Sequence, residues 1–307
     1  MLLEFRAYWP GRSRKEAKLG KERHLLAVAL ATAIVLASVE ASGRTLPADP
    51  VVLAAGDIAA CGSDGDERTA ALLDSNRGTV LALGDIAYDD GTLEEFRECV
   101  GPSWGRHRRR IRPTPGNHEY HTDASGYFRY FGRAAGPAGR GYYSFDLGSW
   151  HIVSLNSERD TGATGAQVRW LRADLTRARA RCILAFWHRP RWSGGKYSDD
   201  GRTAPLWNAL YDARADIVLS GHDHNYQRYP PMNKRGVIQR ARGIRSFVVG
   251  TGGVRLYEVR ADSRRRAAND GTWGLLKLTL RPAGYRWRFL PVAGARYRDS
   301  GSGACSA

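Results

Sequence analysis

Several features that would assign this chain to a protein class at once are missing from its sequence. None of its four cysteines forms a C-x-x-C pair, which argues against a zinc knuckle. The G-x-x-x-x-G-K-S/T and G-x-G-x-x-G loops are both absent, so GTGG at 250–253 is expected to form a turn. Residues 50–300 contain no repeat of solenoid length and no linker, and helix-turn-helix, RRM and zinc-finger signatures are absent. A solenoid, a P-loop protein and a specific nucleic-acid binder are therefore disfavoured.

A hydrophobic run long enough to span a membrane is also missing. The apolar run LLAVALATAIVLAS at 25–38 is shorter than the ~20 residues that a spanning helix needs. Basic residues between positions 12 and 23 precede this run, and small residues follow it. This plan is typical of a secretory signal peptide with cleavage after Ala41, and the same segment can also remain as an anchor. We therefore expect residues 1–41 to be a signal peptide or N-terminal anchor, and residues 42–307 to be one secreted or cell-envelope domain. Contact with a membrane is expected only if the segment is uncleaved.

Acidic residues are scarce relative to basic ones. The chain has 31 aspartates and glutamates against 47 lysines and arginines, which gives a formal net charge of +16. This balance favours anionic partners such as phosphorylated substrates, acidic membranes or nucleic acid. The basic residues are spread along the chain apart from RHRRRIR at 106–112 and RRR at 264–266. We interpret the cluster at 106–112 as a solvated face, with an anion-collecting surface as the alternative.

The four cysteines bear on disulfide formation, which export would permit. Cys61 and Cys99 each lie shortly after a GDIA sequence, and the two can meet. Cys182 opens an apolar strand and is predicted to be a core thiol. The sequence alone does not give the pairing of these residues or of Cys305.

The chain after residue 50 alternates between predicted strands and helices. Apolar runs predict strands at 51–55, 79–83, 111–114, 182–187 and 216–220, a hairpin over 142–155, and β-structure in SFVVG, LLKLTL and RWRFLPV. Helices are predicted over 66–76, 167–177 and 205–213, and Thr92 with Glu95 forms a capping-box pattern. These elements predict an α/β domain whose last third is antiparallel.

Five of the apolar runs end in residues that bind metals or transfer protons. The runs VVLAAGD, TVLALGDIAY, RPTPGNHE, ILAFWH and IVLSGHDH supply Asp57, Asp85, Tyr88, Asn117, His118, His188, His222 and His224. Ligands gather outside the carboxyl ends of strands in α/β sheets, so these distant residues can converge on one pocket. Two hard cations need oxygen and imidazole ligands with a carboxylate between them, and this set is large enough for two metals and a proton donor.

The order of these motifs resembles the signature of the calcineurin-like metallophosphoesterases, and the GDxxY variant resembles their purple acid phosphatase branch. The motifs are GD at 56–57, GDIAY at 84–88, GNHE at 116–119, His188 and GHDHNYQR at 221–228, and the resemblance covers about residues 50–255. It implies a single catalytic domain with the family's two-sheet β-sandwich flanked by helices, an α/β/β/α architecture.

The resemblance also implies roles for individual residues. One metal would be held by Asp57, Asp85, Tyr88 and His224, and the second by Asp85, Asn117, His188 and His222. Asp85 would bridge the two metals, and His118 would act as general acid or transition-state stabiliser. Asn117 and His118 would contact the substrate, whereas Arg228 would either contact it or brace its own loop.

The tyrosine of the second GD motif, Tyr88, is explained by a ligand that the first motif lacks. Many relatives carry a D-x-H first motif whose histidine ligates the first metal, but this chain has Ala59 at that position. Tyr88 can replace the missing ligand. A phenolate favours a trivalent hard ion. The resemblance therefore implies ferric iron as the first metal and iron, zinc or manganese as the second.

These observations together predict a phosphoric ester hydrolase that uses metal-activated water. A secreted phosphomonoesterase of the acid phosphatase kind, acting on a phosphorylated small molecule, is the favoured form. A phosphodiesterase acting on nucleotides or phospholipid head groups is the nearest alternative, because the same metals serve both reactions. A non-catalytic protein that binds anions or nucleic acid is an alternative of another class, and the intact ligand set argues against it. The sequence does not indicate the oligomeric state.

Overall fold

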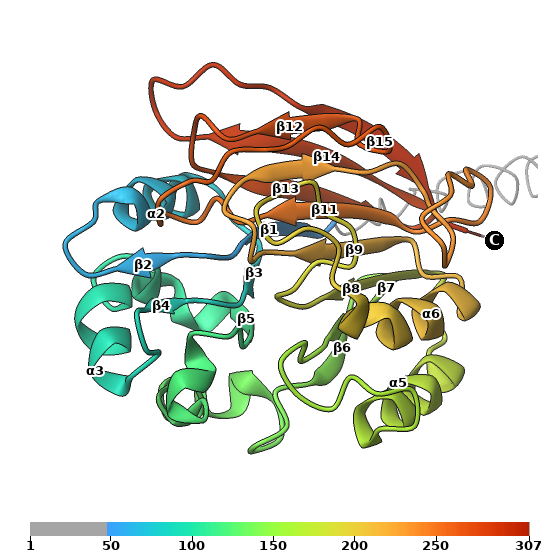
Figure 1. Cartoon of the computed structure of the whole chain (residues 1–307), viewed down its shortest axis with the longest axis horizontal. Coiled ribbons are helices and arrows are strands. Elements are labelled where there is room, and N and C mark those ends of the chain that lie inside the picture. The colour runs from blue at the N-terminus through green and yellow to red at the C-terminus, as the bar shows by residue number, and fades with distance from the viewer. Residues whose placement is uncertain (1–47, 307) are drawn as a thin grey trace, which may run out of the picture. The chain divides into compact units, whose positions relative to one another are not determined.

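The computed structural model describes residues 48–306, so the predicted signal peptide or anchor lies outside the described residues. Two β-sheets pack face to face, and helices cover their outer faces (Figure 1). This arrangement confirms the predicted α/β/β/α sandwich. No helix within residues 48–306 is both long and apolar enough to cross a bilayer.

The first sheet has six strands in the order β15-β14-β13-β1-β3-β5. Parallel strands form one half of it: β1 (Val51–Ala55), β3 (Thr79–Leu83) and β5 (Ile111–Thr114). Antiparallel strands form the other half: β13 (Gly274–Arg281), β14 (Gly284–Pro291) and β15 (Ser300–Ala304). Because the three parallel strands run the same way, their carboxyl ends lie along one edge of the sheet.

The second sheet has seven strands in the order β12-β10-β11-β9-β8-β7-β6. Its parallel strands are β7 (Trp150–Ser154), β8 (Cys182–Phe186), β9 (Ile217–Ser220) and β11 (Arg245–Val249). Its antiparallel strands are β6 (Tyr143–Leu147), β10 (Tyr226–Arg228) and β12 (Ala267–Asn269). A small parallel pair, β2 (Ala59–Ala60) and β4 (Ala87–Tyr88), follows β1 and β3 along the chain.

The main helices start and end within a residue of the predicted ranges. They are α2 (Gly65–Ser75), α5 (Ala166–Arg177) and α6 (Ala204–Asp212). Shorter helical segments are α3 (Leu93–Glu95), α4 (Ser125–Phe131), the π-helical η1 (Phe96–Val100), and the 3-10 turns η2 (Trp104–Arg110), η3 (Glu119–Thr122), η4 (Gly132–Ala135) and η5 (Gly201–Thr203).

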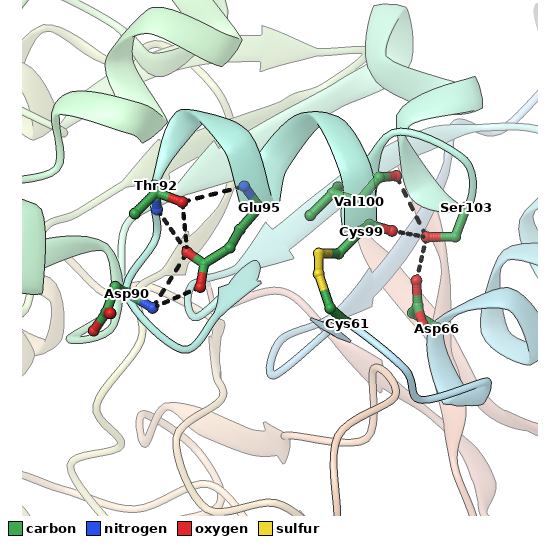
Figure 2. The surroundings of a disulfide bond; sticks show 8 residues. All are labelled: Cys61, Asp66, Asp90, Thr92, Glu95, Cys99, Val100 and Ser103. Carbon is green, nitrogen blue, oxygen red and sulfur yellow. Dashed lines mark hydrogen bonds between the residues drawn. A yellow bond between two sulfur atoms is a disulfide. The ribbon is translucent and has the colours of Figure 1, made fainter.

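The predicted capping box opens α3 (Figure 2). The backbone N–H of Glu95 donates to Thr92 Oγ1 at 3.1 Å, and the backbone N–H of Thr92 donates to the Glu95 carboxylate at 2.8 Å. These two bonds satisfy N–H groups that a helix start would otherwise leave unpaired.

Alternate residues of the second sheet bury two different apolar layers. Leu184 of β8 belongs to the layer between the sheets, whereas its neighbours Ile183 and Ala185 belong to the layer beneath α5 and α6. Aromatic pairs join the two sheets, with ring centroids 5.8 Å apart for Trp150 and Tyr285. The sheets are therefore held together directly through side chains of β7 and β14.

Disulfides join all four cysteines. Cys61 is bonded to Cys99 of η1, as the sequence allowed (Figure 2). Cys182 is bonded to Cys305, which lies 123 residues further along the chain. The prediction that Cys182 is a core thiol is therefore wrong. Strand β15 pairs with β14 and carries the end of the chain back to the start of β8, and no local pattern in the sequence reports this long-range return.

His151 of β7 links the β6–β7 hairpin to α5. Its Nδ1 lies 2.8 Å from Asp146 Oδ1 and its Nε2 lies 2.8 Å from Asp174 Oδ2. Burial lowers the pKa of His151, but the hydrogen bonds to the two carboxylates outweigh burial and raise its pKa above the ordinary value. The link is therefore strongest while His151 is protonated. Its contribution to stability is complete below the ordinary histidine pKa and is lost as the pH rises through the raised one.

We expect the free energy of unfolding to fall by about 1–3 kcal/mol as the pH rises through the raised pKa of His151 and this link weakens. Asp174→Asn should remove most of that pH dependence, because the amide does not stabilise the imidazolium as a carboxylate does. Urea unfolding between pH 5 and pH 9 measures the effect. Asp64→Asn, an exposed aspartate at the start of α2, is the matched control. If the free energy of unfolding depended on pH in the same way in the wild type, Asp174→Asn and Asp64→Asn, the role of His151 would be contradicted.

Candidate metal centre

The predicted site residues follow strands from both sheets. Asp57 follows β1, Asp85 follows β3, and Asn117 with His118 follows β5 of the first sheet. His188 follows β8, and His222 and His224 follow β9 of the second sheet. The carboxyl ends of these parallel strands meet where the two sheets face each other, and side-chain contacts connect the residues there into one cluster.

Tyr88 lies at one side of this cluster. Its Oη is 3.1 Å from Asp57 Oδ1, 3.2 Å from Asp85 Oδ2 and 3.2 Å from His224 Nε2. His224 Nε2 is in turn 3.4 Å from Asp57 Oδ1. The structure thus brings together all four residues that were predicted to hold the first metal.

Asp85 continues the cluster toward the second set of predicted ligands. Its Oδ2 lies 3.0 Å from His188 Nε2, and that nitrogen lies 3.1 Å from His222 Nδ1. One ligand atom from each of Asp85, His188 and His222 falls within 4.8 Å of the others. Asp85 therefore contacts both sets of predicted ligands, as a bridging carboxylate must.

His118 joins the cluster through the same aspartate, and Asn117 precedes it in the chain. The backbone N–H of His118 donates to Asp85 Oδ1 at 2.8 Å, and His118 Nε2 lies 3.9 Å from Asp85 Oδ2. The side-chain oxygen of Asn117 is buried and has no hydrogen-bond partner within the described residues. A buried oxygen without a partner, on the residue next to His118, fits a site that is completed by a cation.

The donor set also fits hard metal ions. Asp57 and Asp85 are almost completely buried, and a buried pair of carboxylates needs compensating positive charge. Carboxylate, phenol, amide and imidazole groups are the oxygen and nitrogen ligands that such ions take. The residues present therefore fit two cations that share Asp85.

The imidazoles at this cluster are oriented by their second nitrogens. His188 Nδ1 faces the carbonyl oxygen of Leu83 at 2.9 Å, and His224 Nδ1 faces that of Arg255 at 2.8 Å. Each contact fixes the proton on Nδ1 and leaves the lone pair of Nε2 toward the carboxylates, as is usual in metal-ligating histidines. The ring of His222 has the opposite orientation, because its Nδ1 and not its Nε2 lies toward His188. Its Nε2 lies 2.8 Å from Arg189 Nη1.

The backbone at these strand ends is held in an unusual conformation. Asp57, Asp85 and His222 all have positive φ values, of 59°, 47° and 69°. Such values are uncommon for non-glycine residues and cluster at functional sites. Gly84 has a φ of +83°, and a Cβ at this position would lie 2.7 Å from the Cβ of His188. Glycine at position 84 therefore lets the two sheets approach closely enough for Asp85 and His188 to meet.

Electrostatics in the metal-free cluster follow from the two buried carboxylates. Burial raises the pKa of Asp85, but nearby His188 and His118 outweigh it, and the net shift is downward. Burial lowers the pKa of His188, but Asp85 and Asp57 raise it to about 10. Burial and the same two aspartates raise the pKa of Tyr88. The cluster thus binds positive charge, which protons provide when metal ions do not.

Glu119 belongs to the GNHE motif and holds the loops of the site together. Its carboxylate accepts hydrogen bonds from the backbone N–H groups of Gly116 and Asp85 through Oε2, and of Ile86 and Ala87 through Oε1, at 2.7–3.2 Å. Burial and Asp85 raise its pKa to about 7, and the N–H groups oppose that shift. Glu119 therefore positions the two loops that carry Asp85 and Asn117. The GNHE motif contains it, but nothing in the motif shows that its partners are backbone groups.

Two tyrosines outside the predicted motifs cover the histidines. Tyr197 stacks on His222 with ring centroids 4.2 Å apart, and Tyr257 stacks on His224 at 4.1 Å. Asp223 anchors the first of these by accepting a hydrogen bond from the backbone N–H of Tyr197 at 2.9 Å. No periodic pattern in the sequence marks these loop residues.

Arg228 does not join the cluster. Its Nε and Nη2 donate to the two carboxylate oxygens of Asp299 at 2.8 and 2.9 Å, and its guanidinium lies over the ring of Trp287. Of the two roles considered for Arg228, the structure shows a brace between β10 and the C-terminal segment, and the contact with substrate stays a prediction. Because 71 residues separate the partners of this ion pair, no local pattern reveals it.

Comparisons with known proteins agree with the motif order. Residues 50–226 match the family described as calcineurin-like phosphoesterase. The chain is 30% identical over 196 residues to purple acid phosphatase 23 of Arabidopsis thaliana, covering 51% of this chain and 43% of that protein. It is 30% identical over 186 residues to acid phosphatase type 7 of Homo sapiens, covering 50% and 41%. The chain thus spans less than half the length of these relatives.

Solved structures share the fold at low sequence identity. The purple acid phosphatase PPD1 of yellow lupin has a TM-score of 0.67 and 18% identity, covering 84% of this chain and 54% of that one. GAP50, described as the anchor in the inner membrane complex of Plasmodium, has a TM-score of 0.67 and 12% identity, covering 85% and 90%. At these identities the likeness concerns the fold alone, and proteins of different roles share it.

Proposed function

Because this chain belongs to the calcineurin-like phosphoesterase family, we propose that it is a phosphoric ester hydrolase with two metal ions. The observation that carries this proposal is the gathering of carboxylate, phenol and imidazole donors in one cluster, centred on Asp85 between Tyr88 and His188. A decayed, non-catalytic member of the family would be expected to have lost at least one of these groups. The names of the acid phosphatase relatives favour monoesters as substrates.

The proposed ligands form two sets that share one residue. The first metal would be held by Asp57, Asp85, Tyr88 and His224, and the second by Asp85, Asn117, His188 and His222. Bound cations would polarise the phosphoryl group and lower the pKa of water. The phenol of Tyr88 favours ferric iron at the first position, with iron, zinc or manganese at the second.

His118 is proposed as the general acid. Its Nδ1 lies 2.5 Å from the carbonyl oxygen of Asp89, so that nitrogen carries a proton and fixes the ring. The other nitrogen, Nε2, faces the cluster beside Asp85, on a side chain that is partly exposed. From this position Nε2 can donate a proton to the alkoxide that leaves the phosphorus, which is the step where negative charge develops on the leaving group.

The proposal includes an extracytoplasmic location. The disulfides Cys61–Cys99 and Cys182–Cys305 use all four cysteines of the chain. Disulfides persist in oxidising compartments and are rare in the cytosol. This observation supports secretion or residence in the cell envelope, in agreement with the signal peptide predicted over residues 1–41.

The test of the proposed function is the metal content and ester hydrolysis of the purified chain. We expect about two metal ions per chain, a visible absorption band from the Tyr88–iron pair, and faster hydrolysis of p-nitrophenyl phosphate than of bis(p-nitrophenyl) phosphate. Tyr88→Phe should remove the band and about one metal ion, whereas Tyr142→Phe, in the layer beneath α5, should change neither.

The alternatives predict different results in the same assays. Faster turnover of the diester would favour a phosphodiesterase. A chain that binds no metal, hydrolyses neither ester and binds DNA in a salt-dependent way would be a non-catalytic anion binder, and the proposed function would be wrong.

A further inference from the structure

Arg189 contacts a predicted ligand of the second metal, and no role was assigned to it from the sequence. We propose that Arg189 binds a phosphoryl oxygen of the ester. This inference rests on the proposed function and adds a substrate-binding residue to it.

The guanidinium of Arg189 is fixed in place on one side. Its Nε donates to Glu158 Oε2 at 2.8 Å, and its backbone N–H donates to Ser157 Oγ at 3.0 Å. Ser157 Oγ also donates to the second carboxylate oxygen of Glu158 at 2.9 Å. Only 17% of the Arg189 side chain and 7% of the Glu158 side chain are exposed, so this ion pair is rigid and largely screened from water.

The other side of the guanidinium faces the candidate metal centre. Nη1 lies 2.8 Å from His222 Nε2. The opposite side of this ring, at Nδ1, lies 3.1 Å from His188 Nε2, so a single imidazole ring separates the guanidinium from the other predicted ligands of the second metal.

The guanidinium lies beside the centre, and its charge and geometry are suited to phosphate. A guanidinium presents parallel N–H donors that match two oxygens of a phosphoryl group. Glu158 keeps the arginine from reaching solvent, so little side-chain entropy is lost when the phosphate binds. The bound cation and Arg189 would thus contact the same phosphoryl group from adjacent directions.

The experiment that tests this proposal measures binding of inorganic phosphate to the zinc-loaded protein by calorimetry. Arg189→Gln should weaken phosphate binding about 10- to 100-fold, raise KM for a monoester in parallel, and leave the metal content unchanged. Arg189→Lys should bind phosphate more weakly than the wild type and more tightly than Arg189→Gln, because lysine keeps the positive charge but lacks the parallel N–H donors of a guanidinium. Arg202→Gln removes a guanidinium from an exposed pair with Asp200 and is the matched control.

Wild-type phosphate affinity in Arg189→Gln, or a loss of metal from that variant, would overturn this inference and leave the proposed function intact. A wild-type chain that binds no zinc would overturn both.

Discussion

Asp85→Asn is expected to lower kcat for a phosphate monoester by about 1,000-fold or more and to remove at least one of two metal ions. Asp85 Oδ2 lies beside both Tyr88 and His188, so it is the carboxylate placed to join the two sets of ligands. An amide presents a single neutral oxygen and does not bridge two cations as a carboxylate does. A 1,000-fold loss corresponds to about 4 kcal/mol of transition-state stabilisation, in the range expected for loss of a catalytic metal.

The variant should nevertheless fold. The hydrogen bond from the backbone N–H of His118 ends on Asp85 Oδ1, and the oxygen of asparagine can accept it equally well. The number of metal ions per chain, measured together with kcat and kcat/KM, distinguishes a variant that has lost a metal ion from one that has not folded. Asp64→Asn serves as the control because Asp64 is exposed at the start of α2. Hydrolysis near the wild-type rate with two metals bound would show that Asp85 does not bridge.

The sequence predicted strands best where both faces of a strand are buried. Strands β1 and β3 match the predicted ranges 51–55 and 79–83 because nearly every residue in a central parallel strand must be apolar. Strand β15, with the sequence SGSGA, was not predicted, because it pairs with β14 through backbone groups and has no apolar face. Strands β10 and β12 were missed because three residues are too few to establish a period.

The candidate site was predictable as far as it depends on strand ends. Residues such as Asp57 and His188 directly follow buried strands, and topology then brings them to one edge. Residues that act through partners distant in the sequence were not predictable. Glu119 bonds to backbone groups more than 30 positions away, and Arg189 contacts His222 across two strands. No local pattern reports such contacts.

The repeated GDIA sequence has a physical explanation in the structure. The backbone N–H groups of Asp57, Ile58 and Ala59 donate to the carbonyl oxygens of Gly84, Asp85 and Ile86 at 2.9–3.2 Å. The two copies therefore continue the pairing of β1 with β3 as the small β2–β4 pair. This register places Asp57 and Asp85 side by side, and only the second copy extends to the tyrosine that contacts both.

Glu119→Gln is expected to lower the melting temperature by about 10 °C and to release metal ions from the centre. One carboxylate oxygen accepts from the backbone N–H groups of Asp85 and Gly116, and the other accepts from those of Ile86 and Ala87. Whichever oxygen is replaced by the amide NH₂ group, two buried backbone N–H groups then face a donor. Each costs about 1–3 kcal/mol, which for a domain of this size corresponds to several degrees in melting temperature.

The same substitution tests whether Glu119 acts as a carboxylate. Burial raises its pKa to about 7, so a protonated Glu119 would donate one hydrogen bond itself, and glutamine would then replace it at little cost. Four converging N–H groups require the ionised form instead, because only that form accepts at both oxygens. Thermal unfolding and metal content of Glu119→Gln, compared with the exposed Glu98→Gln of η1, distinguish these states. A melting temperature and metal content equal to those of the control would mean that the loops carrying Asp85 and Asn117 are held without the carboxylate, and that the metal centre is organised by the strand ends alone.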